Sequence, residues 1–222
     1  PLPSPGRAES CVIIEAGDDI YIFDMGNGSV NNLTQYQLPW PNLKAVLITH
    51  MHSDHMADLP DAHLQSWVQG RTAPLKVYGP EGINLVTKGF ELAYSPDYQY
   101  RNEHHGDDML PMSIAGFNAI QIIDNQLILN DTPGLEILPF AVDHYPVNSA
   151  FGFKVSYKGR TVVISGDTIH DGSVQKYSQD VDLLVHSAIS IDIVERMRKL
   201  APIPQMDKIL LDIQDYHTSI KE

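Results

Sequence analysis

Cysteine is almost absent from this chain, and long apolar runs are missing altogether. Cys11 is the only cysteine among 222 residues, which excludes an internal disulfide framework. It lies in the segment that we expect to form the first strand, so we interpret it as a small buried side chain and not as a nucleophile. No apolar stretch reaches membrane-spanning length, and no repeat or low-complexity linker divides the sequence. We therefore expect a single α/β domain over residues 1–222, without a membrane span.

Basic side chains are also scarce. The chain has 15 Lys and Arg against 28 Asp and Glu, a net charge of -13. Such a charge repels polyanions, and affinity for RNA depends heavily on Lys and Arg that neutralise phosphates. A small basic group, Arg196, Arg198 and Lys199, is interpreted as the solvated face of a helix. Composition therefore argues against a long nucleic acid as partner. It leaves small esters open, because bound metal ions would supply positive charge locally.

Histidine, in contrast, is concentrated in one place. His50, His52, Asp54 and His55 form an H-x-H-x-D-H run directly after Lys44 to Ile48, a short β-branched stretch typical of a buried strand. Residues two apart on a strand point the same way, so the first two imidazoles can converge on one ion while Asp54 and His55 turn toward another. A His-rich loop without metal is the alternative, but this spacing favours metal binding. Imidazole and carboxylate suit zinc, manganese or iron, and two ions about 3.5–4 Å apart could clamp the oxygens of a hydrolysis.

At this point the chain resembles the metallo-β-lactamase-fold hydrolases, and the resemblance covers nearly its whole length. Within that superfamily it is similar to the branch that contains ribonuclease Z and the related arylsulfatases. Five segments carry the resemblance in addition to the histidine run: 1–7 (Pro-Leu-Pro-Ser-Pro-Gly-Arg), 23–28 (Phe-Asp-Met-Gly-Asn-Gly), 77–82 (Val-Tyr-Gly-Pro-Glu-Gly), 142–144 (Val-Asp-His) and 163–168 (Val-Ile-Ser-Gly-Asp-Thr).

The resemblance implies a four-layer αββα sandwich and a binuclear centre, with two zinc ions first and Mn²⁺ or Fe²⁺ as alternatives. His50, His52 and His144 would hold one ion, Asp54 and His55 the other, and Asp167 would bridge both. A bridging hydroxide would be the nucleophile, with Asp54 and Asp167 as the catalytic carboxylates. Asp24 would steady a ligand imidazole by a hydrogen bond.

The departures from the family pattern are equally specific. The branch supplies one more histidine near the C-terminus, whereas here the chain ends at Glu222 soon after His217, so we expect the extreme ends to be missing. His217 is a candidate substitute for that ligand, although family position argues against it. His186 is followed by Ser187, where ribonucleases Z carry a glutamate that helps protonate the leaving group. Only about twenty residues separate His144 from Asp167, too few for the arm with which those nucleases grip transfer RNA.

The remaining pattern predicts alternating strands and helices. We expect a hairpin from Cys11–Glu15 and Ile20–Phe23, a helix from about Met56 to Val68, a strand from Leu75 to Tyr78, and a helix opening at Glu81–Gly82 toward Phe90. Residues 94–111 are expected to form an irregular loop, in which Tyr98, Tyr100, His104 and His105 are candidates for lining a substrate pocket. Later strands are expected near Ile120, Leu135, Phe151, Thr161 and Leu183, with helices near Gln175, Ile191 and Met206.

Together these features predict a metal-dependent hydrolase that cleaves a small anionic ester, either a sulfate ester or a phosphodiester. A lactone or thioester is the alternative substrate, and a catalytically degenerate scaffold protein is the alternative of another class. A tRNA 3'-processing nuclease is disfavoured by the charge, by Ser187 and by the missing arm. A homodimer is left open, as is the compartment, cytoplasmic or periplasmic.

Overall fold

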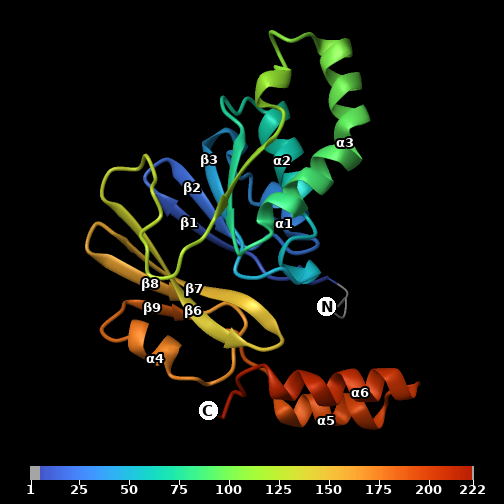
Figure 1. Ribbon diagram of the computed structural model, residues 1–222, viewed down its shortest axis with the longest axis vertical. Helices are drawn as coiled ribbons and strands as arrows, with labels where there is room; N and C mark the ends of the chain where they lie inside the picture. The colour runs from blue at the N-terminus through green and yellow to red at the C-terminus, as the bar shows by residue number, and fades with distance from the viewer. Residues whose placement is uncertain (1–5, 222) are drawn as a thin grey trace. The chain divides into compact units, whose positions relative to one another are not determined.

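The structure, a computed structural model, describes residues 6–221 and divides into two compact units. The N-terminal unit extends to Ile122 and the C-terminal unit begins at Ile123. Each unit contains its own β-sheet, as the labelled strands of Figure 1 show. Of the segment 1–7 that carries part of the resemblance, residues 1–5 lie outside the described residues.

The N-terminal unit is built on a five-stranded sheet in the order β1-β2-β3-β4-β5. β1 (Val12–Ala16) and β2 (Asp19–Phe23) form the predicted antiparallel hairpin, and Cys11 precedes its first strand. β2, β3 (Leu43–Leu47), β4 (Leu75–Gly79) and β5 (Phe117–Gln121) run parallel. Strands of a parallel sheet are usually buried on both faces, which explains why residues 45–48 form one apolar run.

From residue 6 to Ile122, three α-helices and three short 3-10 helices accompany this sheet. They are α1 (Ser29–Gln35), η1 (Trp40–Asn42), η2 (Ser53–His55), α2 (Leu59–Val68), α3 (Ile83–His105) and η3 (Met112–Ile114). The main core joins one face of the sheet to α1, α2 and the start of α3, with Ile22, Val46, Leu33, Leu59 and Ile83 among its buried members. α2 begins three residues later than predicted, at Leu59, and Pro60 lies in its first turn, where proline is tolerated.

The expected loop over residues 94–111 is wrong for most of its length, because α3 continues to His105. Pro96 lies inside this helix and lacks the N–H that would bond to the carbonyl of Leu92. The hydroxyl of Ser95 donates to that Leu92 carbonyl at 3.0 Å and so replaces the missing bond. An ion pair one turn apart, Arg101 Nε to Asp97 Oδ2 at 2.8 Å, supports the following turn.

The C-terminal unit is built on a four-stranded sheet in the order β6-β7-β8-β9. β6 (Leu135–His144), β7 (Val147–Tyr157) and β8 (Arg160–Ile164) are antiparallel neighbours, whereas β9 (Leu183–Val185) runs parallel to β8. The helices are α4 (Ser173–Tyr177), α5 (Ile191–Lys199), α6 (Pro204–Asp212) and η4 (Ile213–Asp215). α5 and α6 pack against each other as an antiparallel pair (Figure 1). All the strands and helices predicted for this half are therefore present.

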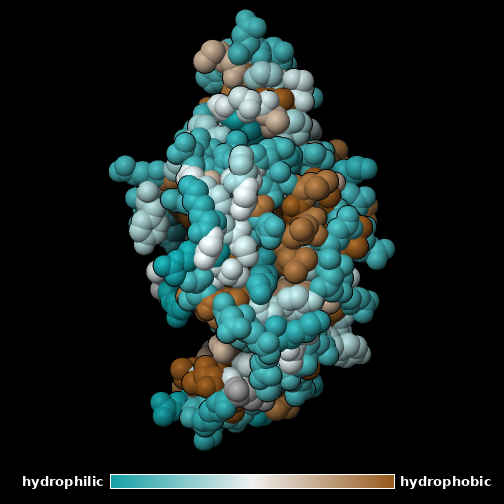
Figure 2. Space-filling view, turned by 90° about the vertical axis from the view of Figure 1, so that its left-hand side faces the viewer, coloured by the Kyte–Doolittle hydropathy of each residue, from teal (hydrophilic) through white to brown (hydrophobic). Residues whose placement is uncertain are grey.

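In the described part of the chain, no helix is long and apolar enough to cross a membrane. Figure 2 shows a face of the molecule that is mostly hydrophilic, with hydrophobic side chains gathered in limited patches.

Candidate metal centre

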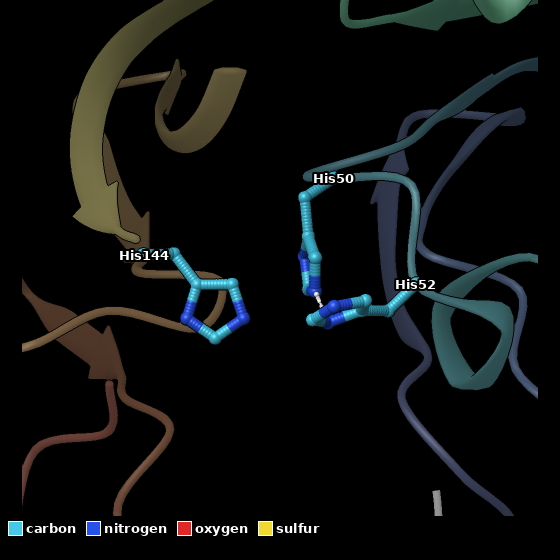
Figure 3. Close-up of side chains that lie close together, drawn as sticks. All are labelled: His50, His52 and His144. Atoms are coloured by element: carbon cyan, nitrogen blue, oxygen red, sulfur yellow. Dashed lines mark hydrogen bonds between the residues drawn. The ribbon is translucent and has the colours of Figure 1, made fainter. Parts of the chain in front are cut away.

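The histidine run lies on the loop that leaves the carboxyl end of β3, as predicted. η2 (Ser53–His55) closes this loop, His50 and His55 are buried, and His52 is exposed. Figure 3 shows His50 and His52 pointing toward each other, and the distance between His50 Nε2 and His52 Nδ1 is 2.9 Å. Two nitrogens that share one tetrahedral zinc ion at about 2.0–2.1 Å lie roughly 3.3 Å apart. These two imidazoles are thus close to the spacing that a shared metal ion requires.

Asp24 makes four contacts, three with residues of this loop and one with Ser10. Its Oδ1 accepts the backbone N–H of Thr49 at 2.8 Å, and its Oδ2 accepts the hydroxyls of Thr49 at 3.0 Å and Ser10 at 3.1 Å. The same Oδ2 lies 2.7 Å from His55 Nδ1. A carboxylate at this distance fixes the proton on Nδ1, which makes Nε2 the ring nitrogen able to coordinate a metal. Asp24 therefore lies against His55, one of the candidate ligands.

The backbone around Asp24 also contacts β3 and the histidine loop closely. Asp24 has φ of 60°, in the left-handed region that aspartate tolerates better than most residues. Its N–H donates to Leu47 O at 2.9 Å, and the N–H of Met25 donates to His55 O at 2.7 Å. A Cβ on Gly26 would lie 2.1 Å from the carbonyl oxygen of Asp54, so only glycine fits there. The D-x-G turn and the histidine loop therefore pack directly on each other.

A second set of candidate ligands lies in the C-terminal unit. His144 ends β6 (Figure 3), is 1% exposed, and has its Nδ1 2.9 Å from the carbonyl oxygen of Tyr216. Asp167 follows β8, and His217 follows η4. One ligand atom from each of His144, Asp167 and His217 lies within 4.8 Å of the others, a spacing that one ion could span. Sequence reasoning gave His217 only a secondary place, and the structure brings it into the group.

Two threonines hold this second set together. Thr168 donates its hydroxyl to Asp143 O at 3.0 Å, which ties the turn after β8 to the end of β6. Thr218 donates both its N–H and its hydroxyl to Thr168 O, each at 2.8 Å. Because these threonines adjoin Asp167 and His217 in the chain, they fix three distant segments around one group. Sequence reasoning missed their role, and the only signal for it is their position next to candidate ligands.

The other candidates lie elsewhere. His186 follows β9 with its Nδ1 2.6 Å from Ser187 O, and it is in none of the candidate ligand groups found among residues 6–221. Tyr98 is 3% exposed and packs edge-on against Trp67, at 5.6 Å between ring centroids, so it belongs to a core and lines no open pocket. Tyr100, His104 and His105 are exposed on α3. Cys11 is partly buried, and burial raises the pKa of its thiol to about 11, which agrees with a structural role.

Comparison with known proteins identifies the family. The family model for the Metallo-beta-lactamase superfamily matches residues 4–206, most of the chain. The chain belongs to the metallo-β-lactamase superfamily. Its fold class is confirmed by solved structures: human tRNase Z, short form, has a TM-score of 0.64 at 24% identity and covers 100% of this chain and 90% of its own. The metallo-β-lactamase fold protein YhfI from Bacillus subtilis has a TM-score of 0.63 at 22% identity, covering 86% of this chain and 69% of its own.

Curated relatives define the branch of the superfamily. Ribonuclease Z of Mycobacterium bovis (strain BCG / Pasteur 1173P2) is 34% identical over 100% of this chain and 76% of its own length. Ribonuclease Z of Mycobacterium marinum is 32% identical over the same shares of the two chains. Within the superfamily, the chain therefore belongs to the ribonuclease Z family. It is a metal-dependent hydrolase that acts on ester bonds, and its His and Asp groups could hold the metal.

Two predictions from the sequence are corrected by these relatives. The small anionic ester as substrate, and the exclusion of a long nucleic acid as partner, are both wrong, because full-length relatives are named as ribonucleases. The net charge of -13 sums every side chain, whereas a polyanion responds to the charge where it binds. Ser187 and the short link between His144 and Asp167 are departures within the family and do not remove the chain from it.

Proposed function

We propose that this chain is a ribonuclease of the Z type that hydrolyses a phosphodiester near the 3' end of a tRNA precursor. The observation that carries the proposal is the identity of 34% with a ribonuclease Z along 100% of this chain. The histidine loop after β3 supports it, because its His50 and His52 nitrogens are spaced for one metal ion. The arylsulfatase part of the sequence resemblance stays a prediction.

The proposed metal ligands are those of the sequence resemblance. They are His50, His52, Asp54 and His55 in the N-terminal unit and His144 and Asp167 in the C-terminal unit, with His217 added because it groups with the last two. Neutral imidazoles and carboxylates fit zinc first, with manganese and iron as alternatives, and two ions is the number that the family pattern implies. When bound, divalent ions neutralise phosphodiester oxygens and lower the pKa of water.

The protein's own groups then have distinct tasks. Asp24 holds His55 in the tautomer that coordinates through Nε2, as its 2.7 Å contact with Nδ1 supports. Asp54, half-buried with Oδ2 3.9 Å from His55 Nε2, is proposed to orient the attacking water and to accept its proton. The leaving group is the ribose oxygen of the P–O bond that breaks, and His186 is a candidate to protonate it to a hydroxyl. Its Nδ1 is engaged with Ser187 O, which leaves Nε2 for that transfer.

The test is cleavage of a tRNA precursor with a 3' trailer by metal-replete protein, with the new 3' end mapped to single-nucleotide resolution. Asp167→Asn removes a proposed ligand oxygen, and we expect the rate to fall by at least 100-fold while the protein stays folded. Asp108→Asn, the same change at an exposed position on the segment after α3, is the matched control and keeps the parent rate. Equal rates for Asp167→Asn and the parent, or no cleavage of any RNA by the parent, would contradict the proposal.

A further inference from the structure

A cavity of about 310 Å³ lies within the C-terminal unit, beside the group formed by His144, Asp167 and His217. Its walls come from three places: α4 with the turn before it, β9 with the segment after it, and residues 218–219. None of the candidate metal ligands lines it. The cavity does include His186, proposed above to protonate the leaving group, and this position beside the reacting bond is what suggests a role.

The walls are continuous with the candidate ligands. Thr218 adjoins His217, and Ile169 is two residues beyond Asp167; both residues line the cavity. Consecutive Cα atoms are 3.8 Å apart, so each of these wall residues lies within about 8 Å of a candidate ligand. The two hydrogen bonds from Thr218 to Thr168 O, and the bridge between Ile189 and Ser219, keep both walls in register. A group bound here would be adjacent to a phosphodiester at the ligands.

The chemistry of the walls defines what fits. Ile169, Val174, Leu184 and Ala188 supply apolar surface. Among the described residues, no lysine or arginine lines the cavity. Its single carboxylate, Asp171, already accepts hydrogen bonds from the N–H and hydroxyl of Ser173 at 2.8 and 2.9 Å. A phosphate would find no cation there, so the cavity suits an uncharged, partly apolar group.

Polar atoms at the rim add hydrogen-bonding capacity for such a group. His170 and Gln175 are paired, with 2.6 Å between His170 Nε2 and Gln175 Nε2, and the amide oxygen of Gln175 is an acceptor. His186 also lines the cavity, and with its Nδ1 engaged by Ser187 O its Nε2 is the ring nitrogen left for a further hydrogen bond. Apolar walls combined with a few hydrogen-bonding groups and with imidazole rings, on which a base can stack, suit an unstacked nucleobase.

We propose that this cavity binds one unpaired base of the RNA, on a nucleotide next to the phosphodiester that is cut. The inference rests on the proposed ribonuclease function and adds to it a subsite of named residues. A base held there would position the strand at the ligands through stacking and not through charge, which suits a chain with a net charge of -13.

The experiment uses the full chain with metal and a set of tRNA precursors, each with one abasic nucleotide among the positions that flank the cleavage site. With the parent protein, we expect one position at which loss of the base raises KM about tenfold with little change in kcat. Ala188→Phe, which fills the exposed side of the cavity, should raise KM for the intact precursor by a similar factor. The abasic change should then add nothing further. Ala73→Phe, an equal change at an exposed site in the N-terminal unit, is the control.

A second readout does not depend on catalysis. The fluorescent base 2-aminopurine, placed at the sensitive position, should be quenched when the parent binds the RNA without metal, and should stay bright with Ala188→Phe. Gln175→Ala should weaken the quenching, whereas Gln205→Ala on α6 should not. If the parent cleaves precursors but every abasic effect is the same in Ala188→Phe, the cavity inference alone is overturned. If the parent cleaves no precursor, the proposed function fails first.

Discussion

At the scale of single residues, the contact between Asp24 and His55 Nδ1 leads to the prediction that Asp24 sets which nitrogen of His55 can coordinate a metal. Asn fits the same left-handed backbone, so Asp24→Asn should keep the fold. Its amide, however, would present an N–H group to His55 Nδ1 and shift the ring proton to Nε2, the coordinating position. We expect zinc affinity, measured by competition with a chromogenic chelator, to fall 10- to 100-fold. Asp108→Asn serves as the matched control, and unchanged affinity in Asp24→Asn would contradict the role assigned to Asp24.

His63 on α2 is a second residue with a measurable consequence. It is 0% exposed with Nδ1 3.3 Å from the hydroxyl of Tyr98, and burial, followed by the nearby charge of Arg71, lowers its pKa from 6.5 to about 3. Below pH 6.5, His63 therefore binds a proton in the unfolded chain but not in the folded protein. The free energy of unfolding consequently falls as the pH decreases from 6.5 toward 3. The loss attributable to His63 is about 2 kcal/mol at pH 5.

The measurement is the free energy of unfolding by urea at pH 7 and at pH 5. His63→Gln keeps a polar group for Tyr98 but cannot titrate, so we expect its stability to fall less between these two values than that of the parent. His105→Gln, an exposed histidine on α3, should show the pH dependence of the parent. If His63→Gln loses as much stability as the parent, His63 is protonated in the folded protein near its ordinary pKa.

At the scale of elements, α3 shows how a helix passes through a proline. The hydroxyl of Ser95 replaces the bond that Pro96 cannot make to Leu92 O. We expect Ser95→Ala to lower the free energy of unfolding by about 0.5 kcal/mol. In a Pro96→Ala background, the restored N–H takes the same carbonyl, and Ser95→Ala should then cost close to nothing. Urea unfolding of the four proteins in this double-mutant cycle tests the compensation, and an equal cost in both backgrounds would refute it.

The elements also show what the sequence could and could not predict. The β1–β2 hairpin and β3 were predictable, because their apolar alternation and turn residues are local signals. The second half of α3 was not predictable, because the Tyr, Asp and His residues around Pro96 show no apolar periodicity. The hydrogen bond of Ser95 that compensates for the proline also leaves no signal in the sequence pattern. In the same way, the spacing of His50 and His52 in the sequence was enough to predict that they lie together. The position of His217 depends instead on pairing between Ile189 and Ser219, which are far apart in the chain.

At the scale of the whole molecule, the net charge gave a wrong prediction of the substrate, whereas the local motifs gave the right family. A net charge of -13 is a property of the entire chain, and it argued against RNA although the relatives are ribonucleases. The expectation of a single domain stays a prediction. Each of the two compact units has its own sheet and its own His and Asp candidates. The homodimer and the compartment likewise stay predictions.

The distance along the chain between partners in the C-terminal group has a consequence for how the protein is made. Tyr216, whose carbonyl contacts His144 Nδ1, is 72 residues further along the chain, and His217 follows it directly. A ribosome that adds about 5–20 residues per second needs on the order of 4–14 s to pass from one to the other. During that interval the nascent chain carries His144 and then Asp167 without His217, so the C-terminal group cannot form until the segment from 145 to 217 has been added.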